Sequence, residues 1–272
     1  MKILFLGTGA GEMFPATFCM CKYCKKARRQ GNIMPGSSIL IDNQYLVDAP
    51  TGLGLNLAFL KINVKFPFYI FITHSHQDHF DPEEIISTRD DIGNKIYLYI
   101  NKTILRLLKH YTKFNRFFNF DKFKNYCVNI VKPFKPLKIN KDAVVIPILA
   151  NHDKTYNEEN INYILKIKNR TILYACDTGW YCDKTWQEVK KHKLDVVILE
   201  CSFLKTKTNG KNHMDSDCFL KFIDELKKSK SIDKHTQIIA THFSLHDFDD
   251  GEIARLEKQG VKIACRGMIC KC

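Results

Sequence analysis

The 272-residue chain is predicted to form an α+β fold in which two mixed β-sheets pack together and helices cover their outer faces. Short apolar segments typical of strands alternate with helical segments almost from end to end. Two pairs of neighbouring strands are separated by Asp42-Asn43 and by Lys168-Asn169-Arg170, which are typical hairpin turns. No repeat and no Gly/Ser/Pro-rich linker divides the chain, so we expect a single domain over residues 1–272.

The predicted elements follow from the spacing of apolar residues. The strands are Lys2–Leu6, Ser38–Ile41, Tyr45–Val47, Phe68–Ile72, Ile96–Ile100, Val144–Leu149, Ile161–Ile167, Thr171–Tyr174, Val196–Leu199, Gln237–Ala240 and Val261–Ala264. The helices are Gly52–Leu60, Pro82–Arg89, Thr103–Tyr111, Lys184–Lys191, Asp217–Lys228 and Glu252–Gln259. The helix over Asp217–Lys228 has the clearest apolar stripe, formed by Phe219, Leu220, Phe222, Ile223 and Leu226 with lysines opposite.

The composition predicts a protein without a membrane-spanning helix. No apolar run approaches the roughly 18 residues that a span requires, and the apolar stretch after Met1 is too short for a secretory signal. We therefore expect a cytoplasmic location. The eleven cysteines are then expected to be thiols or metal ligands rather than disulfides.

The formal net charge of +13 favours an anionic substrate, such as a phosphate ester or a nucleic acid. A surface of solvated lysines explains the same charge equally well.

One segment, Lys102 to Lys141, has an unusual composition. It holds eleven Lys and Arg residues against one acidic residue, Asp121, and aromatic residues are interleaved with them. One interpretation is a lid or a nucleic-acid-binding surface, where aromatics stack on bases and lysines contact phosphates. The interpretation we favour is an inserted helical cap or dimer surface whose aromatics form a buried face.

Four potential metal ligands stand together directly after the strand Phe68–Ile72. They are His74, His76, Asp78 and His79. Because side chains two residues apart in an extended chain point the same way, His74 and His76 can share one ion. Asp78 and His79 must then turn elsewhere, which suits a second ion. Four such groups would be costly to bury without partners, so the cluster predicts a metal site.

Three later residues would supply the remaining ligands of a two-ion site. His152, Asp177 and His242 each follow a predicted apolar strand. A single polar residue at a strand end is uninformative, but strand ends are where loops assemble sites, and the three share that placement.

With these residues in this order, the chain resembles the metallo-β-lactamase fold superfamily over nearly its full length. The resemblance implies an αββα sandwich with two ions at the strand ends. By position, His74, His76 and His152 would hold one ion, Asp78, His79 and His242 the other, and Asp177 would bridge them. Asp48 matches a buried acid that orients a ligand histidine. The glycine turn Gly7–Gly11 also fits the start of that family.

The cysteines Cys19, Cys21 and Cys24 have the Cys-x-Cys-x-x-Cys spacing that can bind one face of a tetrahedral zinc. This loop resembles the PhnP-type branch of the superfamily, the phosphoribosyl cyclic phosphodiesterases. That branch implies a structural zinc whose fourth ligand would be His246 in this chain.

The predicted catalytic residues are His213 and Asp78. His213 opens the loop before the helix that begins near Ser216. In this superfamily a histidine at that place faces the substrate as proton donor or phosphate partner. The alternative is a surface histidine beside a helix. Cys265, Cys270 and Cys272 lack a fourth ligand and are expected to be incidental thiols on a frayed tail.

The predicted activity is the hydrolysis of a small phosphodiester, with cyclic ones among the candidates. Two Zn²⁺ or Mn²⁺ ions would activate water and clamp the substrate oxygens, and one further Zn²⁺ would be structural. The alternatives are a nuclease related to the tRNA 3′-processing endonucleases, which the basic charge favours, or an accessory, thioesterase or lactonase member of the fold. We expect the protein to bind a small anionic substrate and not to associate with a membrane. The sequence is compatible with a homodimer.

Overall fold

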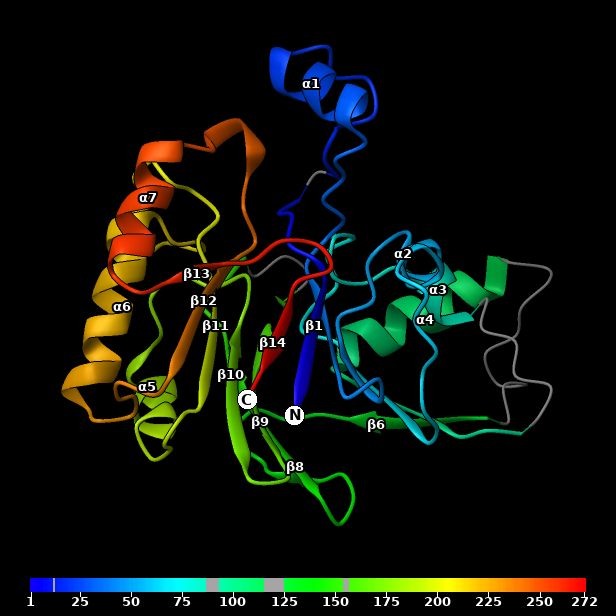
Figure 1. The fold of residues 1–272 in the computed structure, drawn as a ribbon. Helices are drawn as coiled ribbons and strands as arrows, with labels where there is room; N and C mark the ends of the chain where they lie inside the picture. Colours follow the sequence, from blue (N-terminus) through cyan, green and yellow to red (C-terminus); the bar gives the residue numbers. More distant parts are fainter. Residues whose placement is uncertain (12, 87–92, 115–124, 154–156) are drawn as a thin grey trace. The chain divides into compact units, whose positions relative to one another are not determined.

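The computed structural model describes residues 1–11, 13–86, 93–114, 125–153 and 157–272 (Figure 1). These residues form two compact units. The first contains the described residues of 1–131, 156–158 and 266–271, and the second contains those of 132–155, 159–265 and 272. Each unit is built on one seven-stranded sheet.

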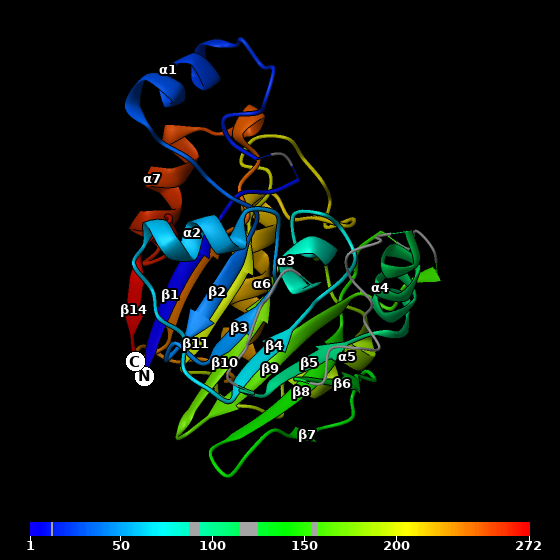
Figure 2. The ribbon, with the colours of Figure 1, turned by 90° about the vertical axis from the view of Figure 1, so that its right-hand side faces the viewer.

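The sheet of the first unit is mixed (Figure 2). Its order is β14 (Ile269–Lys271), β1 (Lys2–Gly7), β2 (Ser38–Ile41), β3 (Tyr45–Val47), β4 (Phe68–Phe71), β5 (Ile96–Ile100) and β6 (Tyr126–Ile130). The pairs from β14 to β3 are antiparallel, and those from β3 to β6 are parallel. Parallel strands β3, β4 and β5 all end at the same edge, where the loops after them begin.

The turn between β2 and β3 confirms the hairpin predicted at Asp42-Asn43. Both residues have positive φ, 50° and 59°, as a tight turn between antiparallel strands requires.

Helices α1 (Lys22–Gln30), α2 (Leu53–Phe59), α3 (Pro82–Ile86) and α4 (Lys102–Phe114) complete the first unit. Helix α4 places Ile104 and Leu108 in the same core cluster as the apolar face of the sheet. The segment 102–141 thus contributes α4 and β6 to the first unit. Residues 115–124, with Phe117, Phe118, Phe120 and Phe123, lie outside the described residues.

The sheet of the second unit is also mixed. Its order is β13 (Lys262–Ile263), β12 (Gln237–Thr241), β11 (Val196–Glu200), β10 (Arg170–Ala175), β9 (Ile161–Ile167), β8 (Ala143–Leu149) and β7 (Leu137–Lys138). Strands β10 to β13 are parallel, and the others pair antiparallel. The remaining elements are α5 (Asp183–Val189), α6 (Ser216–Lys228), η3 (Leu245–Asp247) and α7 (Asp250–Lys258).

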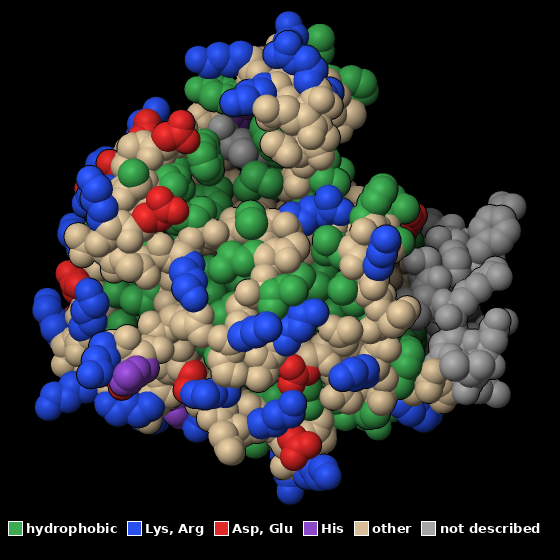
Figure 3. Space-filling model, viewed as in Figure 1, with side chains coloured by type: hydrophobic (Ala, Val, Ile, Leu, Met, Phe, Trp, Pro, Cys, Tyr) green, Lys and Arg blue, Asp and Glu red, His purple; other side chains and the backbone are tan. Residues whose placement is uncertain are grey.

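Most of the apolar stripe predicted for α6 is buried. Phe219, Phe222, Ile223 and Leu226 are at most 2% exposed and face the core of the second unit, whereas Leu220 is only partly buried. Lysine and arginine side chains are spread over the face drawn in Figure 3, in keeping with the net charge of +13.

All eleven predicted strands are present, but the prediction of a frayed C-terminal tail is wrong. Ile269–Lys271 forms β14, which pairs with β1, and Cys270 is 2% exposed. Backbone pairing at a sheet edge therefore orders this short segment. Within the described residues, no helix is both long enough and apolar enough to cross a bilayer.

Candidate metal centre

The loop after β4 brings the first group of predicted ligands together. His74 and His79 are almost fully buried, and the ring of His74 lies 4.5 Å from that of His76 and 4.4 Å from that of His79, centroid to centroid. The strand thus delivers three imidazoles and the adjacent Asp78 to one edge of the first sheet, as the sequence pattern predicts.

The buried carboxylate of Asp48 fixes the orientation of two of these rings. Its Oδ2 lies 2.8 Å from Nδ1 of His79, and its Oδ1 accepts the backbone N–H of Thr73 at 2.8 Å and the Thr73 hydroxyl at 2.9 Å. Nδ1 of His74 is 3.0 Å from that hydroxyl oxygen. Because the hydroxyl gives its proton to Asp48, it accepts from His74. Both rings therefore carry the proton on Nδ1 and present an Nε2 lone pair, the form that binds metal.

Asp78 is held by a backbone contact from the glycine turn. The N–H of Gly11 donates to Asp78 Oδ2 at 2.7 Å, and the same oxygen lies 3.4 Å from Nε2 of His79. Gly11 has φ 46°, a conformation that favours glycine. The turn after β1 therefore fixes this carboxylate beside His79.

In the second unit, Asp177 lies between two histidines. Its Oδ2 is 3.4 Å from Nε2 of His152 and 3.7 Å from Nε2 of His242. Asp177 is 2% exposed. One carboxylate oxygen thus lies close to the ring nitrogens of two histidines.

The outer nitrogens of these two rings are also fixed. Nδ1 of His152 lies 3.1 Å from the carbonyl oxygen of Asn212, which can only accept, so this nitrogen carries the proton. Nδ1 of His242 lies 2.7 Å from the hydroxyl of Ser202, which donates to Glu200 and so accepts from the ring. Both histidines thus present an Nε2 lone pair toward Asp177.

Glu200 organises the second unit as Asp48 organises the first, and the sequence analysis missed it. It is fully buried at the end of β11. Its oxygens accept the backbone N–H of Thr178 at 2.6 Å and of Met214 at 3.2 Å, besides the Ser202 hydroxyl. The signal was present in the sequence, since Glu200 follows an apolar strand just as Asp177 does.

His213 lies against two of these carboxylates. Its Nδ1 is 2.9 Å from Asp177 Oδ1 and 3.3 Å from Glu200 Oε1. Burial opposes protonation of His213, but the charge of Glu200 and the hydrogen bond to Asp177 outweigh it and raise its pKa to about 11. The side chain is 27% exposed, so the protonated ring can be reached from outside.

Three of the site residues adopt the left-handed backbone conformation. Asp48, Asp177 and His242 have φ of 64°, 58° and 60°. This conformation costs a residue other than glycine roughly 1–2 kcal/mol. At each of these three strand ends, a residue in this unfavourable conformation carries a side chain that can bind a metal or a proton. Such strained residues are typical of functional sites.

The thiols of Cys19, Cys21 and Cys24 lie within 4.8 Å of one another in the first unit. Hydrogen bonds from the backbone of Cys24 and from Cys19 lower the pKa of Cys21 to about 7, whereas burial raises that of Cys24. His246, their predicted fourth partner, is exposed on η3 of the second unit. Within the described residues, Cys265, Cys270 and Cys272 belong to no such cluster.

Comparisons with known proteins identify the family. A family model described as "Beta-lactamase superfamily domain" matches residues 43–243. Similar solved structures include Zn²⁺-bound PqqB from Methylobacterium extorquens, with 15% identity, a TM-score of 0.75 and complete coverage of both chains. A diphosphatase from the PhnP family shares 20% identity at a TM-score of 0.70, covering 100% of this chain and 97% of that one. The short form of human tRNase Z shares 18% sequence identity at a TM-score of 0.68, covering 100% of this chain and 99% of that one.

No curated protein sequence matches the chain. The structural likenesses have low sequence identity, so they show a shared fold, while the family model covers well over half of the sequence. The two mixed sheets and their helices correspond to the αββα fold predicted from the sequence. The chain therefore belongs to the metallo-β-lactamase superfamily.

Proposed function

We propose that this protein is a dinuclear metal-dependent phosphodiesterase that acts on a small phosphodiester. The observation that carries the proposal is Asp177, whose Oδ2 lies between Nε2 of His152 and Nε2 of His242. Both rings have their proton on the opposite nitrogen, so two lone pairs and one carboxylate oxygen converge.

The residues fit a pair of divalent ions. Four imidazoles have an Nδ1 held by a neighbour, and the assigned set adds carboxylates, which suits Zn²⁺ or Mn²⁺. In our assignment His74, His76 and His152 would hold one ion, Asp78, His79 and His242 would hold the other, and Asp177 would be shared by both. When bound, the ions would supply a hydroxide nucleophile at neutral pH and neutralise charge on the substrate oxygens.

His213 is the proton donor in this proposal. Glu200 and Asp177 both contact its Nδ1, which leaves Nε2–H as the end that can meet the leaving oxygen. A pKa of about 11 keeps the ring protonated at neutral pH. A cation on Asp177 would draw away part of the stabilising charge and bring that pKa closer to neutrality, where proton transfer is more effective.

A third, structural zinc would be held by Cys19, Cys21, Cys24 and His246. The closeness of the three thiols and the lowered pKa of Cys21 support this, because thiolates are the zinc-binding form. This zinc would brace the N-terminal loop. We accordingly assign the chain to the PhnP-type branch of the superfamily. A cytoplasmic location agrees with reduced thiols at these positions.

A phosphodiester is preferred as substrate because the chain carries a net charge of +13 and would attract an anion. Two of the similar structures are a diphosphatase and a tRNase Z. The charge also supports a second candidate, an RNA-processing nuclease. Cleavage of a precursor tRNA at its 3′ end, with no cleavage of small diesters, would favour that second candidate.

The proposal is tested with Asp177→Asn, assayed for metal content and for hydrolysis of bis(p-nitrophenyl) phosphate. Asparagine tolerates the left-handed conformation but lacks the charge, so we expect loss of at least one ion and of nearly all turnover. Asp42→Asn is the matched control, since Asp42 also has positive φ and lies in a hairpin turn. Full activity with both ions retained in Asp177→Asn would refute the bridging assignment.

A further inference from the structure

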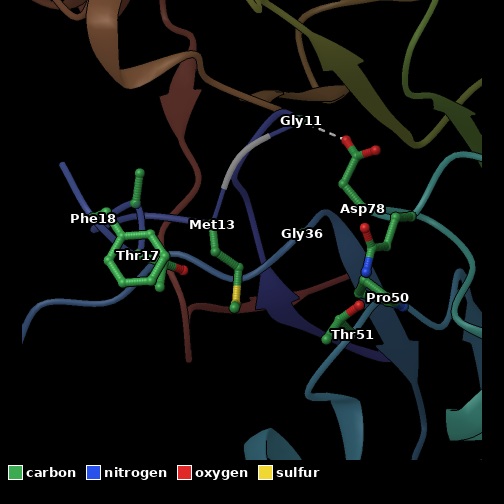
Figure 4. A pocket seen from close by; sticks show the side chains of 10 residues that line it. Gly11, Met13, Thr17, Phe18, Gly36, Pro50, Thr51 and Asp78 are labelled. Atoms are coloured by element: carbon green, nitrogen blue, oxygen red, sulfur yellow. Dashed lines mark hydrogen bonds between the residues drawn. The ribbon is translucent and has the colours of Figure 1, made fainter.

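A pocket of about 460 Å³ lies in the first unit beside Asp78 (Figure 4). Its volume is within the usual range for small-molecule sites, roughly 300–1,000 Å³. In Figure 4, Phe18 and Asp78 lie at opposite sides of the pocket, with Met13 between them. Pro50 and Thr51, from the loop after β3, line the side nearer Asp78.

Phe18 presents an almost bare aromatic ring at this pocket. It is 93% exposed, and Met13 beside it is 50% exposed. The loop that carries Phe18 is nevertheless anchored, because the guanidinium of Arg28 donates to the carbonyls of Ala16, Thr17 and Cys19. A large apolar ring on an anchored loop is a ready surface for stacking.

The polar groups of the pocket are few and uncharged apart from Asp78. The lining contains no lysine, arginine or histidine among the described residues. The side chains of Thr17 and Gln77 make no hydrogen bond to any other described residue, so their hydroxyl and amide are available to a ligand. The lining therefore does not suit a second phosphate, but it suits a flat, uncharged group with donors and acceptors on its edge.

We propose that this pocket binds the heterocyclic base of a nucleotide substrate, with Phe18 stacking on the base and Gln77 and Thr17 contacting its edge. The assignment rests on the proposed phosphodiesterase function, because Asp78 would place the phosphodiester at the mouth of the pocket. A nucleobase has both a π-face for the ring and polar edges for the amide and hydroxyl. An alkyl chain would use only the apolar side of the pocket.

The test compares two substrates with the same leaving group, thymidine 5′-(p-nitrophenyl phosphate) and methyl p-nitrophenyl phosphate. The wild-type holoenzyme is expected to favour the thymidine ester in kcat/KM. Phe18→Ala should reduce that preference about tenfold or more, by raising KM for the thymidine ester far more than KM for the methyl ester. Phe18→Tyr should retain the preference because its ring also stacks.

Phe59→Ala is the matched control, since Phe59 is another exposed phenylalanine, on α2, that does not line the pocket. It should leave the preference unchanged. Equal cleavage of the two esters by the wild type, or a preference unaffected by Phe18→Ala, would overturn the base assignment. Stronger preference for an octyl ester than for the thymidine ester would also overturn it.

A binding measurement separates this inference from the proposed activity. Thymidine, which has no phosphodiester to hydrolyse, is titrated calorimetrically into the holoenzyme. Binding that Phe18→Ala weakens and Phe59→Ala does not would support the pocket even if neither ester were cleaved. Absence of binding together with phosphodiesterase activity would refute the pocket and leave the proposed function standing.

Discussion

The proton positions on three histidine rings are set by two buried acids. Asp48 accepts from His79 directly and, through the hydroxyl of Thr73, controls His74. Glu200 controls His242 through the hydroxyl of Ser202 in the same way. In each unit the acid thus selects the ring form that can bind a metal, before any metal is present.

Asp48→Asn tests this control at one residue. Asparagine keeps the shape and tolerates the φ of 64°, but it lacks the negative charge and one acceptor oxygen. We expect metal affinity to fall about 10–100-fold, measured by competition with a chelator. Asp42→Asn should leave the affinity unchanged, and an unchanged affinity in Asp48→Asn would contradict the role given to the acid.

His213 should also make the stability of the metal-depleted protein depend on pH. Its pKa is about 11 in the folded chain, against an ordinary value of 6.5. The folded chain then binds more protons than the unfolded chain between these values, so the stabilisation is complete below pH 6.5 and is lost as the pH rises toward 11.

This dependence is measured by thermal unfolding of metal-depleted wild type and His213→Gln at several pH values from 6 to 10. The advantage of the wild type in melting temperature should shrink steadily as the pH rises. A difference that stays constant across this range would mean that His213 is not held protonated by its neighbours.

At the scale of elements, the N-terminus of α6 holds the loop that carries His213. Asp215 caps the helix, with Oδ1 accepting the N–H groups of Asp217 at 3.0 Å and Cys218 at 3.1 Å. Its Oδ2 accepts the N–H and hydroxyl of Thr208, at the other end of the same loop. One carboxylate therefore joins the start of a helix to the loop of the proposed proton donor.

Asp215→Ala should affect both stability and turnover. Loss of the cap should reduce the free energy of unfolding by about 1–2 kcal/mol in denaturant titrations. Because the loop loses its contact at Thr208, we also expect a lower kcat at unchanged metal content. Asp249→Ala, which removes the cap of α7 and an ion pair with Lys205, gives the stability loss of another helix cap for comparison. A normal kcat in Asp215→Ala would show that the loop is held by other contacts.

The elements that could be predicted from the sequence are those whose buried residues form a run or a stripe of apolar residues. The eleven predicted strands are apolar runs, and most of their residues are buried. Helix α1 could not be predicted, since it buries only Cys24 and Ala27 and has no apolar stripe. Strand β7 has two residues and β14 three, too short for a periodic pattern.

In the candidate site, too, some residues could be predicted from the sequence and others could not. Its proposed ligands could be named from the sequence because each follows an apolar strand. Their hydrogen-bonded partners could not, because Ser202 and Asn212 act through a hydroxyl and a backbone carbonyl that no sequence pattern marks. Glu200 is the one such partner that could have been named, because it stands at the end of an apolar strand as the proposed ligands do.

At the scale of the whole molecule, the family and the fold constrain the chemistry without fixing the substrate. Superfamily membership and the site contacts support metal-dependent hydrolysis, and the net charge of +13 favours an anionic substrate. The choice among phosphodiesters then depends on local features such as the pocket that Phe18 lines. Both the proposed hydrolysis and the proposed base pocket require that the chain binds the two catalytic ions.

The most direct measurement is the metal content of the purified protein by elemental analysis, made alongside hydrolysis of bis(p-nitrophenyl) phosphate. We expect about three ions per chain, two for the dinuclear centre and one for the thiols, with cleavage that disappears on chelation and returns with Zn²⁺ or Mn²⁺. One ion or none after supplementation with both metals would contradict the dinuclear centre.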